Sequence, residues 1–170
     1  MARARRATQR KESGVKGARI LIVEARYYED IADMLLRGAK RVLRDAQAAF
    51  DVITVPGALE IPGAIVMSLD GAADREQPYE GVVALGCVIR GETSHYDIVA
   101  GESARALMQF AITSSTPAGN GILTVDTEAQ AWARARPEEQ DKGGGAARAA
   151  LALVRLKRAL TKPPKPRGRR

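Results

Sequence analysis

The chain has 170 residues, and 45% of them are hydrophobic, which is typical of a single globular domain with a core. No apolar run approaches the roughly 18 residues of a transmembrane helix, and no apolar segment follows the basic N-terminus as it would in a secretory signal. The single cysteine, Cys87, lies inside an apolar run, so we expect a buried, inert thiol and a reducing, cytoplasmic setting. One histidine and one cysteine are too few for a typical zinc site, so we expect no metal.

The net charge of +7 is unevenly distributed along the chain. Residues 1–19 and 155–170 carry 7 and 8 basic residues against 1 acidic residue, so the two ends together hold +14 and the rest of the chain holds −7. Because both ends are also poor in large apolar residues, we expect flexible basic tails over residues 1–17 and 161–170, around a domain over residues 18–160. A solubilising role is favoured for the tails, and contact with nucleic acid through them stays open as the alternative.

The apolar patterns predict strands and helices in alternation. Residues 18–26 form a run rich in Ile, Leu and Val that is typical of a buried strand. A helix follows, in which small and apolar residues recur at helical spacing: Ile31, Leu35, Gly38, Ala39, Val42 and Leu43. Further strands are predicted at residues 50–57, 81–89 and 121–125. Further helices are predicted at residues 60–69, with Pro62 in the first turn, and at residues 96–112, 127–135 and 145–160.

The order of these elements is β-α-β-α-β-α-β-α-α. Strands without strict alternation, each followed by a helix, predict an α/β fold of three layers, in which helices cover both faces of a four-stranded parallel sheet. Such sheets bind ligands outside the carboxyl ends of their strands. The residues that directly follow each strand are therefore the candidates for function.

The segment GCVIRGET, residues 86–93, nearly matches a phosphate-binding P-loop, but Glu92 stands where that motif needs a lysine. What remains is a glycine and two hydroxyl residues that lead into a helix, whose free N–H groups suit a single phosphate. Capping of the helix by Thr93 or Ser94 explains the same residues, so both interpretations stay open. Three glycines at residues 143–145 lack the spacing of a dinucleotide fingerprint and indicate a flexible lead-in or close packing.

Five single residues near the strand ends each have a functional and a structural interpretation. His95 suits proton transfer at neutral pH, or is simply exposed. Glu60 could accept hydrogen bonds from a polyol, or complement its helix dipole. Tyr27 could stack on a planar ring, or pack against its neighbours. Arg134 and Lys142 could hold a phosphate, or form a charged face.

Four motifs occur in order along the chain: ARYYEDIADMLLRGA, VPGALEIPGAI, ALGCVIRGETSHYDIV, and NGILTVDTEAQAWARA followed by DKGG. Together they resemble the lumazine synthase family over residues 19–158. The resemblance implies a flavodoxin-like form of the three-layer fold and an enzyme of the transferase class in riboflavin biosynthesis. Family members condense 5-amino-6-(D-ribitylamino)uracil with 3,4-dihydroxy-2-butanone 4-phosphate to 6,7-dimethyl-8-ribityllumazine, with release of phosphate and water. No metal or organic cofactor is implied.

The resemblance also implies roles for individual residues. His95 matches the residue that transfers protons. Glu92 and Thr93 match the pair whose backbone binds the phosphate, Arg134 matches the arginine that binds it, and Lys142 matches a nearby lysine of the family.

The remaining matches concern the pyrimidine and the ribityl chain. Tyr27 matches the aromatic residue that stacks on the pyrimidine ring. Asn120 occupies a position where many members have a phenylalanine that stacks across a subunit boundary. The segment expected to hold the ribityl chain consists of Ala58, Leu59 and Glu60. The segment expected to present backbone groups to the uracil consists of Cys87, Val88 and Ile89.

Family members form homopentamers whose neighbouring subunits share each site, and some pentamers associate into decamers or icosahedral shells. The resemblance therefore implies a homo-oligomer, with riboflavin synthase as a candidate partner. The chain departs from the family at Asn120, and at Tyr27 and Tyr28, where many members have Phe-Asn. These departures leave an alternative open, namely a catalytically weak, flavin- or lumazine-binding assembly paralogue.

Overall fold

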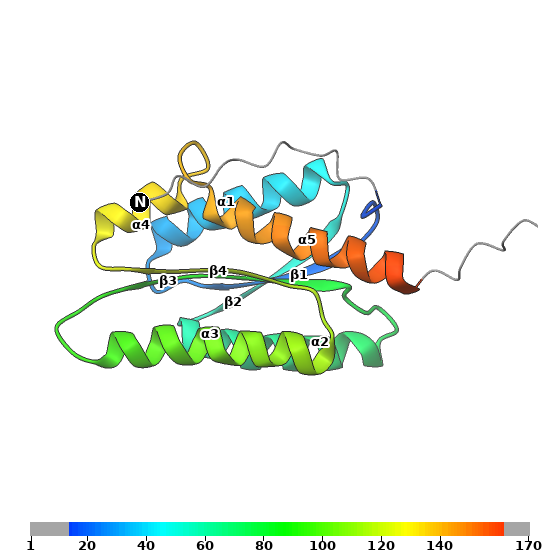
Figure 1. Ribbon diagram of the computed structural model, residues 1–170, viewed down its shortest axis with the longest axis horizontal. Coiled ribbons are helices and arrows are strands. Elements are labelled where there is room, and N and C mark those ends of the chain that lie inside the picture. The colour runs from blue at the N-terminus through cyan, green and yellow to red at the C-terminus, as the bar shows by residue number, and fades with distance from the viewer. Residues whose placement is uncertain (1–13, 162–170) are drawn as a thin grey trace, which may run out of the picture.

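The computed structural model describes residues 14–161, and most of the two predicted basic tails lies outside the described residues. Four parallel strands form one sheet in the order β2-β1-β3-β4 (Figure 1). The strands are β1 (Arg19–Ala25), β2 (Ala49–Val55), β3 (Gly81–Ile89) and β4 (Ala118–Val125). The helices are α1 (Glu29–Asp45), the short 3-10 turn η1 (Ala58–Glu60), α2 (Ile61–Asp74), α3 (His95–Ser114), α4 (Glu128–Ala135) and α5 (Lys142–Thr161).

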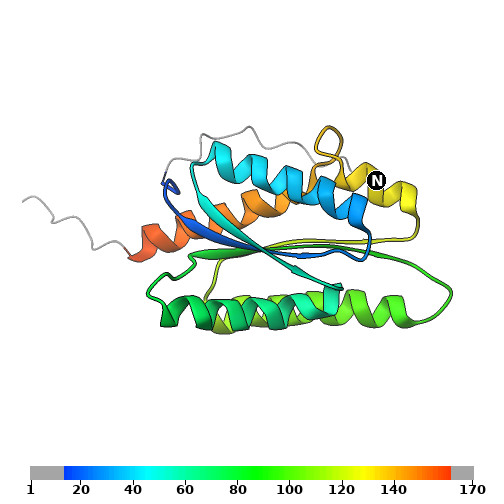
Figure 2. The ribbon, with the colours of Figure 1, turned by 180° about the vertical axis from the view of Figure 1, so that it is seen from behind.

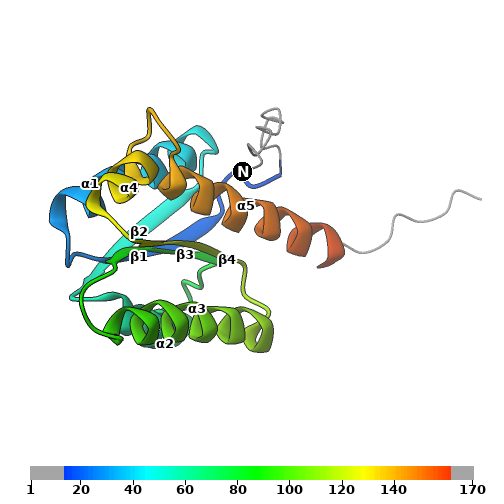
Figure 3. The ribbon, with the colours of Figure 1, turned by 60° about the vertical axis from the view of Figure 1, so that its left-hand side comes forward.

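Helices cover both faces of the sheet. α1, α4 and α5 lie on one face, and α2 and α3 lie on the other (Figures 1 and 2). Seen from the side, α2 and α3 run next to each other along their face (Figure 3). The predicted three-layer α/β fold with a parallel sheet is therefore confirmed.

The central strands are apolar on both sides because both of their faces are covered. In β1, Ile20 and Ile22 belong to the core under α1 and α5, whereas Leu21 and Val23 belong to the core over α2 and α3. All four side chains are fully buried. This two-sided burial explains why the first strand lacks the alternation of a half-exposed strand.

The helices on the first face pack closely because glycines stand where they meet. A side chain at Gly143, in the first turn of α5, would collide with the backbone of Leu35 in α1. Likewise, a side chain at Gly119 of β4 would collide with the backbone of Ala146 in α5. Of the two interpretations of residues 143–145, close packing is thus supported for Gly143 and Gly144, whereas Gly145 has open space beside it.

The predicted elements agree with the structure apart from their ends. The predicted buried face of α1, from Ile31 to Leu43, is confirmed, and Pro62 lies in the first turn of α2. β4, however, begins at Ala118 and not at residue 121, so Asn120 lies within the strand and not before it. α5 begins at Lys142, which places the three glycines inside the helix.

The last residues of the predicted N-terminal tail contact the domain. The side chain of Val15 is fully buried, and the amide of Gly17 donates a hydrogen bond to the carbonyl of Gln47 at 2.9 Å. Arg158 of α5 donates to the carbonyls of Gly14 and Lys16 at 3.1 and 3.3 Å. Among residues 14–161, no helix has the length and apolar character needed to cross a membrane.

Candidate functional site

The carboxyl ends of all four strands meet at one edge of the sheet, as parallel strands require. Two backbone hydrogen bonds extend the ladder by one residue beyond the strands. The amide of Arg26 donates to the carbonyl of Val55 at 3.1 Å, and the amide of Arg90 donates to the carbonyl of Val125 at 2.9 Å. The segments that follow the strands therefore begin at hydrogen-bonded backbone (Figure 1, left).

A buried ionic cluster fixes the turn after β1. Glu24 is almost fully buried, and its carboxylate accepts hydrogen bonds from Arg26 at 3.2 Å and from the hydroxyl of Thr54 at 3.1 Å. Arg26 also pairs with Asp33 of α1 at 2.7 Å, and this hydrogen bond, with a smaller contribution from Glu24, raises the pKa of Arg26. The cluster holds β1, β2 and α1 together directly before Tyr27.

Tyr27 itself is presented to solvent. Its residue is 75% exposed, and its ring meets the half-buried ring of Tyr28 edge-on, with centroids 4.9 Å apart. Burial raises the pKa of Tyr28. Because Tyr28 anchors the turn in the core under α1, one face of Tyr27 is left free for a planar ligand.

The residues after β2 form η1, a single 3-10 turn that leads into α2. η1 packs against β1, β3 and α3. Ala58 is buried, whereas Leu59 and Glu60 are exposed. The carboxylate of Glu60 folds back over Gly57, where a β-carbon would lie 3.0 Å from its Oε2. This segment is placed next to the end of β3, as the sequence predicted for the candidate site.

The end of β3 presents residues alternately to the two layers. Val88 belongs to the apolar cluster that also holds Ala58, whereas Cys87 and Ile89 pack against the cluster on the opposite face. Burial raises the pKa of the Cys87 thiol to about 12. Cys87 is only partly buried, so the prediction of a fully buried thiol is wrong. The thiol is protonated at neutral pH, however, which supports the interpretation of Cys87 as an inert residue.

Arg90 ties the loop after β3 to its surroundings. Its guanidinium donates to Asp97 in the first turn of α3 and to Asp126 after β4, both at 3.2 Å. It also lies 4.0 Å from the centroid of the Tyr96 ring. The hydrogen bond to Asp97, followed by the one to Asp126, raises the pKa of Arg90. The side chain of Arg90 thereby links the two ends of the loop that carries Glu92 and Thr93.

His95 is the first residue of α3 and is exposed. Its backbone N–H donates a long hydrogen bond of 3.4 Å to the hydroxyl of Thr93, and the side chain of Ser94 caps nothing. Capping by Thr93 therefore satisfies one amide only in part. The start of a 20-residue helix, with its positive dipole end, lies beside the only imidazole of the chain.

Arg134 and Lys142 line a hollow of about 390 Å³ beside the free edge of β4. Arg134 donates to the carbonyl of Gln130 at 3.0 Å, one turn earlier in α4. Asn120 also lines this hollow, and its side-chain oxygen accepts a hydrogen bond from the amide of Ile122 at 2.9 Å. Two cations and one amide that surround a single hollow suit a phosphate or another anion.

The predicted site residues thus fall into two groups within one chain. Those after β1, β2 and β3 gather at the carboxyl edge, where His95 heads α3. The hollow with Arg134 and Lys142 includes Asn120 but no other predicted site residue, and α4 and α5 cover the face of the sheet opposite to α3. The helices that carry His95 and the two cations therefore lie on opposite faces of the sheet (Figure 1).

Sequence reasoning missed Glu24 and Asp141, two acidic residues that the fold buries. Asp141 belongs to the DKGG segment, but no sequence pattern predicts the burial of either acid, because that burial depends on basic partners from other parts of the chain. Within residues 14–161, no three His, Cys, Asp or Glu side chains are grouped so that they could hold a metal ion.

Comparison with known proteins gives one consistent result. The sequence profile of the family described as 6,7-dimethyl-8-ribityllumazine synthase matches residues 17–158. The chain is 59% identical to the protein of that name from Nitrobacter winogradskyi over 162 residues, which are 95% of this chain and 99% of the relative. It is 65% identical to the protein of that name from Azorhizobium caulinodans over 144 residues, 85% of this chain and 89% of the relative. It is 57% identical to 6,7-dimethyl-8-ribityllumazine synthase 1 of Rhodopseudomonas palustris over 95% of this chain and 99% of the relative.

Proposed function

Because this chain belongs to the 6,7-dimethyl-8-ribityllumazine synthase family, we propose that it condenses 5-amino-6-(D-ribitylamino)uracil with 3,4-dihydroxy-2-butanone 4-phosphate in riboflavin biosynthesis. The products are 6,7-dimethyl-8-ribityllumazine, phosphate and water. The observation that carries the proposal is the arrangement after β3, where a held loop delivers an exposed imidazole to the carboxyl edge beside a free helix start.

The edge residues divide the binding of the pyrimidine substrate. Tyr27 stacks on the ring, and the backbone of Cys87, Val88 and Ile89 pairs with the uracil. Ala58, Leu59 and Glu60 hold the ribityl chain, whose hydroxyls donate to the exposed Glu60 carboxylate. Side-by-side binding of the two reactants removes much of the entropic barrier of a condensation.

The chemistry requires protons to move at neutral pH. The 5-amino group attacks the ketone of the butanone phosphate, a carbon–nitrogen double bond forms, and water leaves. Elimination of phosphate follows, and attack of the ribitylamino nitrogen on the remaining carbonyl carbon closes the ring and releases a second water. Each of these steps needs a further proton transfer. The imidazole of His95 is suited to give and take these protons because its usual pKa lies close to neutral pH.

The phosphate group needs a separate binding site. The backbone N–H groups of Glu92 and Thr93, near the start of α3, donate hydrogen bonds to one side of the anion, which leaves the Glu92 side chain free to point away. Arg134 and Lys142 donate to the other side and stabilise the leaving phosphate. Because the helices that carry these cations cover the face of the sheet opposite to α3, we assign the Arg134 and Lys142 that meet this phosphate to a neighbouring copy of the chain.

We therefore propose a homopentamer in which each site combines the carboxyl edge of one subunit with the hollow of the next. Sedimentation would distinguish this pentamer from a decamer or an icosahedral shell. We also place the enzyme in the cytoplasm, without a metal or organic cofactor, and propose riboflavin synthase as a partner, since it consumes the product.

A turnover assay tests the function. Purified full-length protein is mixed with both substrates in the presence of a chelator, and lumazine fluorescence is followed against a control without protein. Product formation well above the uncatalysed rate is expected. A rate no higher than the uncatalysed one, together with tight binding of riboflavin or lumazine, would favour the binding paralogue instead. This paralogue is the second candidate because Asn120 has an amide where many family members have an aromatic ring.

A further inference from the structure

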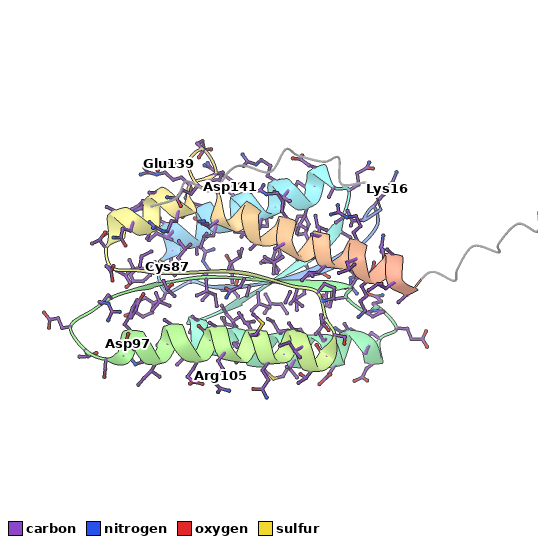
Figure 4. All side chains as sticks on the ribbon, viewed as in Figure 1. Lys16, Cys87, Asp97, Arg105, Glu139 and Asp141 are labelled. Carbon is purple, nitrogen blue, oxygen red and sulfur yellow. The ribbon has the colours of Figure 1, made fainter. Side chains whose placement is uncertain are left out.

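Asp141 is a buried carboxylate at the junction of three elements. Its residue is 7% exposed, and it lies between α4 and α5 directly before Lys142 (Figure 4). Its Oδ2 accepts hydrogen bonds from Arg41 of α1 and from Arg148 of α5, both at 3.1 Å. Its Oδ1 accepts from the amide of Gly144 at 3.2 Å and so caps the start of α5.

The backbone around Asp141 is shaped to hold this carboxylate. Asp141 has a φ of 49°, a left-handed conformation that aspartate tolerates better than most residues. Its amide donates to the carbonyl of Arg136 at 3.1 Å, and its carbonyl accepts from the amide of Gly145 at 2.8 Å. A side chain at Gly38 or at Gly144 would collide with the carboxylate, so both glycines leave the space that it occupies.

The position of Asp141 affects the hollow beside β4, because Lys142 follows it directly. The carboxylate fixes the first turn of α5, and Lys142 is the first residue of that turn. It also pairs with Arg41 of α1 and Arg148 of α5, and neither of these two cations lines the hollow. Lys142 and Arg134 are then the two cations that line the hollow.

We propose that Asp141 is a positioning residue, which sets Lys142 in the hollow beside Arg134 and so tunes the affinity for the phosphate group of the substrate. This inference rests on the proposed function for the identity of the anion. The competing explanation is that the carboxylate only joins α1 to α5. The two explanations differ in whether the effect of Asp141 depends on Lys142.

The test compares four variants of the full-length protein at residues 141 and 142 with one control variant elsewhere. Asp141→Gly keeps the left-handed backbone without strain and removes the carboxylate. Asp141→Asn keeps the cap on Gly144 and removes the charge. Lys142→Ala and the double variant Asp141→Gly/Lys142→Ala complete a double-mutant cycle. Glu80→Gln, which weakens an ion pair with Arg158 away from the hollow, serves as the matched control for a loss of stability.

Asp141→Gly is expected to raise the KM for the butanone phosphate about tenfold, the scale of a misplaced charged hydrogen bond, and to change the KM for the pyrimidine less than about twofold. Asp141→Asn is expected to lie between this variant and the wild type. In the Lys142→Ala background, Asp141→Gly should add less than about twofold, because its effect acts through Lys142. Glu80→Gln should leave both KM values unchanged.

Three results would overturn the inference: no change in the KM for the phosphate substrate, an equal rise in both KM values, or a full effect of Asp141→Gly in the Lys142→Ala background. A wild type that forms no lumazine would refute the proposed function and not this inference. In that event, calorimetric titration with inorganic phosphate compares the same variants. A Kd that rises in Asp141→Gly only when Lys142 is present supports the inference, and an unchanged Kd refutes it.

Discussion

Two inactive variants of this protein should restore each other's activity when they assemble together. His95→Ala removes the imidazole at the carboxyl edge, and Arg134→Ala removes a cation from the hollow beside β4. These residues lie on helices that cover opposite faces of the sheet. If neighbouring subunits share each site, an intact site needs His95 from one subunit and Arg134 from the next.

The magnitude follows from this placement. In a random equal mixture, a given position holds the Arg134 variant with a probability of one half, and its neighbour holds the His95 variant with a probability of one half. About one quarter of the sites, one half times one half, are therefore intact. Each variant alone is expected to lose at least about 100-fold in kcat/KM, so the restored activity would stand far above both.

The assay uses co-expressed variants with different affinity tags, purified over both tags in sequence, and lumazine formation measured per site. A mixture of the two variants purified separately, without subunit exchange, is the control and should stay inactive. Activity of the co-assembled protein at the mere sum of the separate variants would refute the shared site. It would mean that each chain completes its own site.

Two further predictions follow from shifted pKa values. Burial raises the pKa of Cys87 to about 12, whereas an unfolded thiol has a pKa of about 8.5. Iodoacetamide at pH 8 should therefore label the native protein at least about 100-fold more slowly than the protein unfolded in urea. Labelling rates within about tenfold of each other would contradict the raised pKa. Hydrogen bonds from Arg158 lower the pKa of Glu80, so the ion pair stabilises the fold above the unfolded pKa of the carboxyl and loses this effect as the pH falls through the lower, folded pKa. Glu80→Gln should therefore reduce the unfolding free energy at pH 7 by about 1 kcal/mol or less, since the ion pair is partly exposed. The difference in unfolding free energy between this variant and the wild type should disappear below about pH 4. An equal difference at pH 7 and below about pH 4 would contradict this reasoning.

Much of the fold could be predicted because covered parallel strands and their helices have strong local patterns. The apolar run of β3 and the helical spacing from Ile31 to Leu43 in α1 both reappear as buried faces. The start of β4 could not be predicted in this way. Gly119 carries no apolar side chain, and its place in the strand depends on close contact with the backbone of Ala146, far along the chain.

The candidate site shows the same division. His95 and its loop could be singled out because they directly follow a predicted strand. Asp141 was missed because a single acid in a charged loop resembles a solvated residue. Only the fold brings Arg41 and Arg148 to its carboxylate, from α1 and α5.

The most direct test of the account concerns proton transfer by the one histidine of the chain. Single-turnover rates of lumazine formation would be measured for the wild type and for His95→Gln at saturating substrates, with the Kd of each substrate measured in parallel. We expect the rate to fall by about 10²–10⁴-fold, the scale of a lost acid–base group, with both Kd values and the assembly state unchanged. A rate within about threefold of the wild type, with the same assembly, would show that another group moves the protons and would contradict the mechanism.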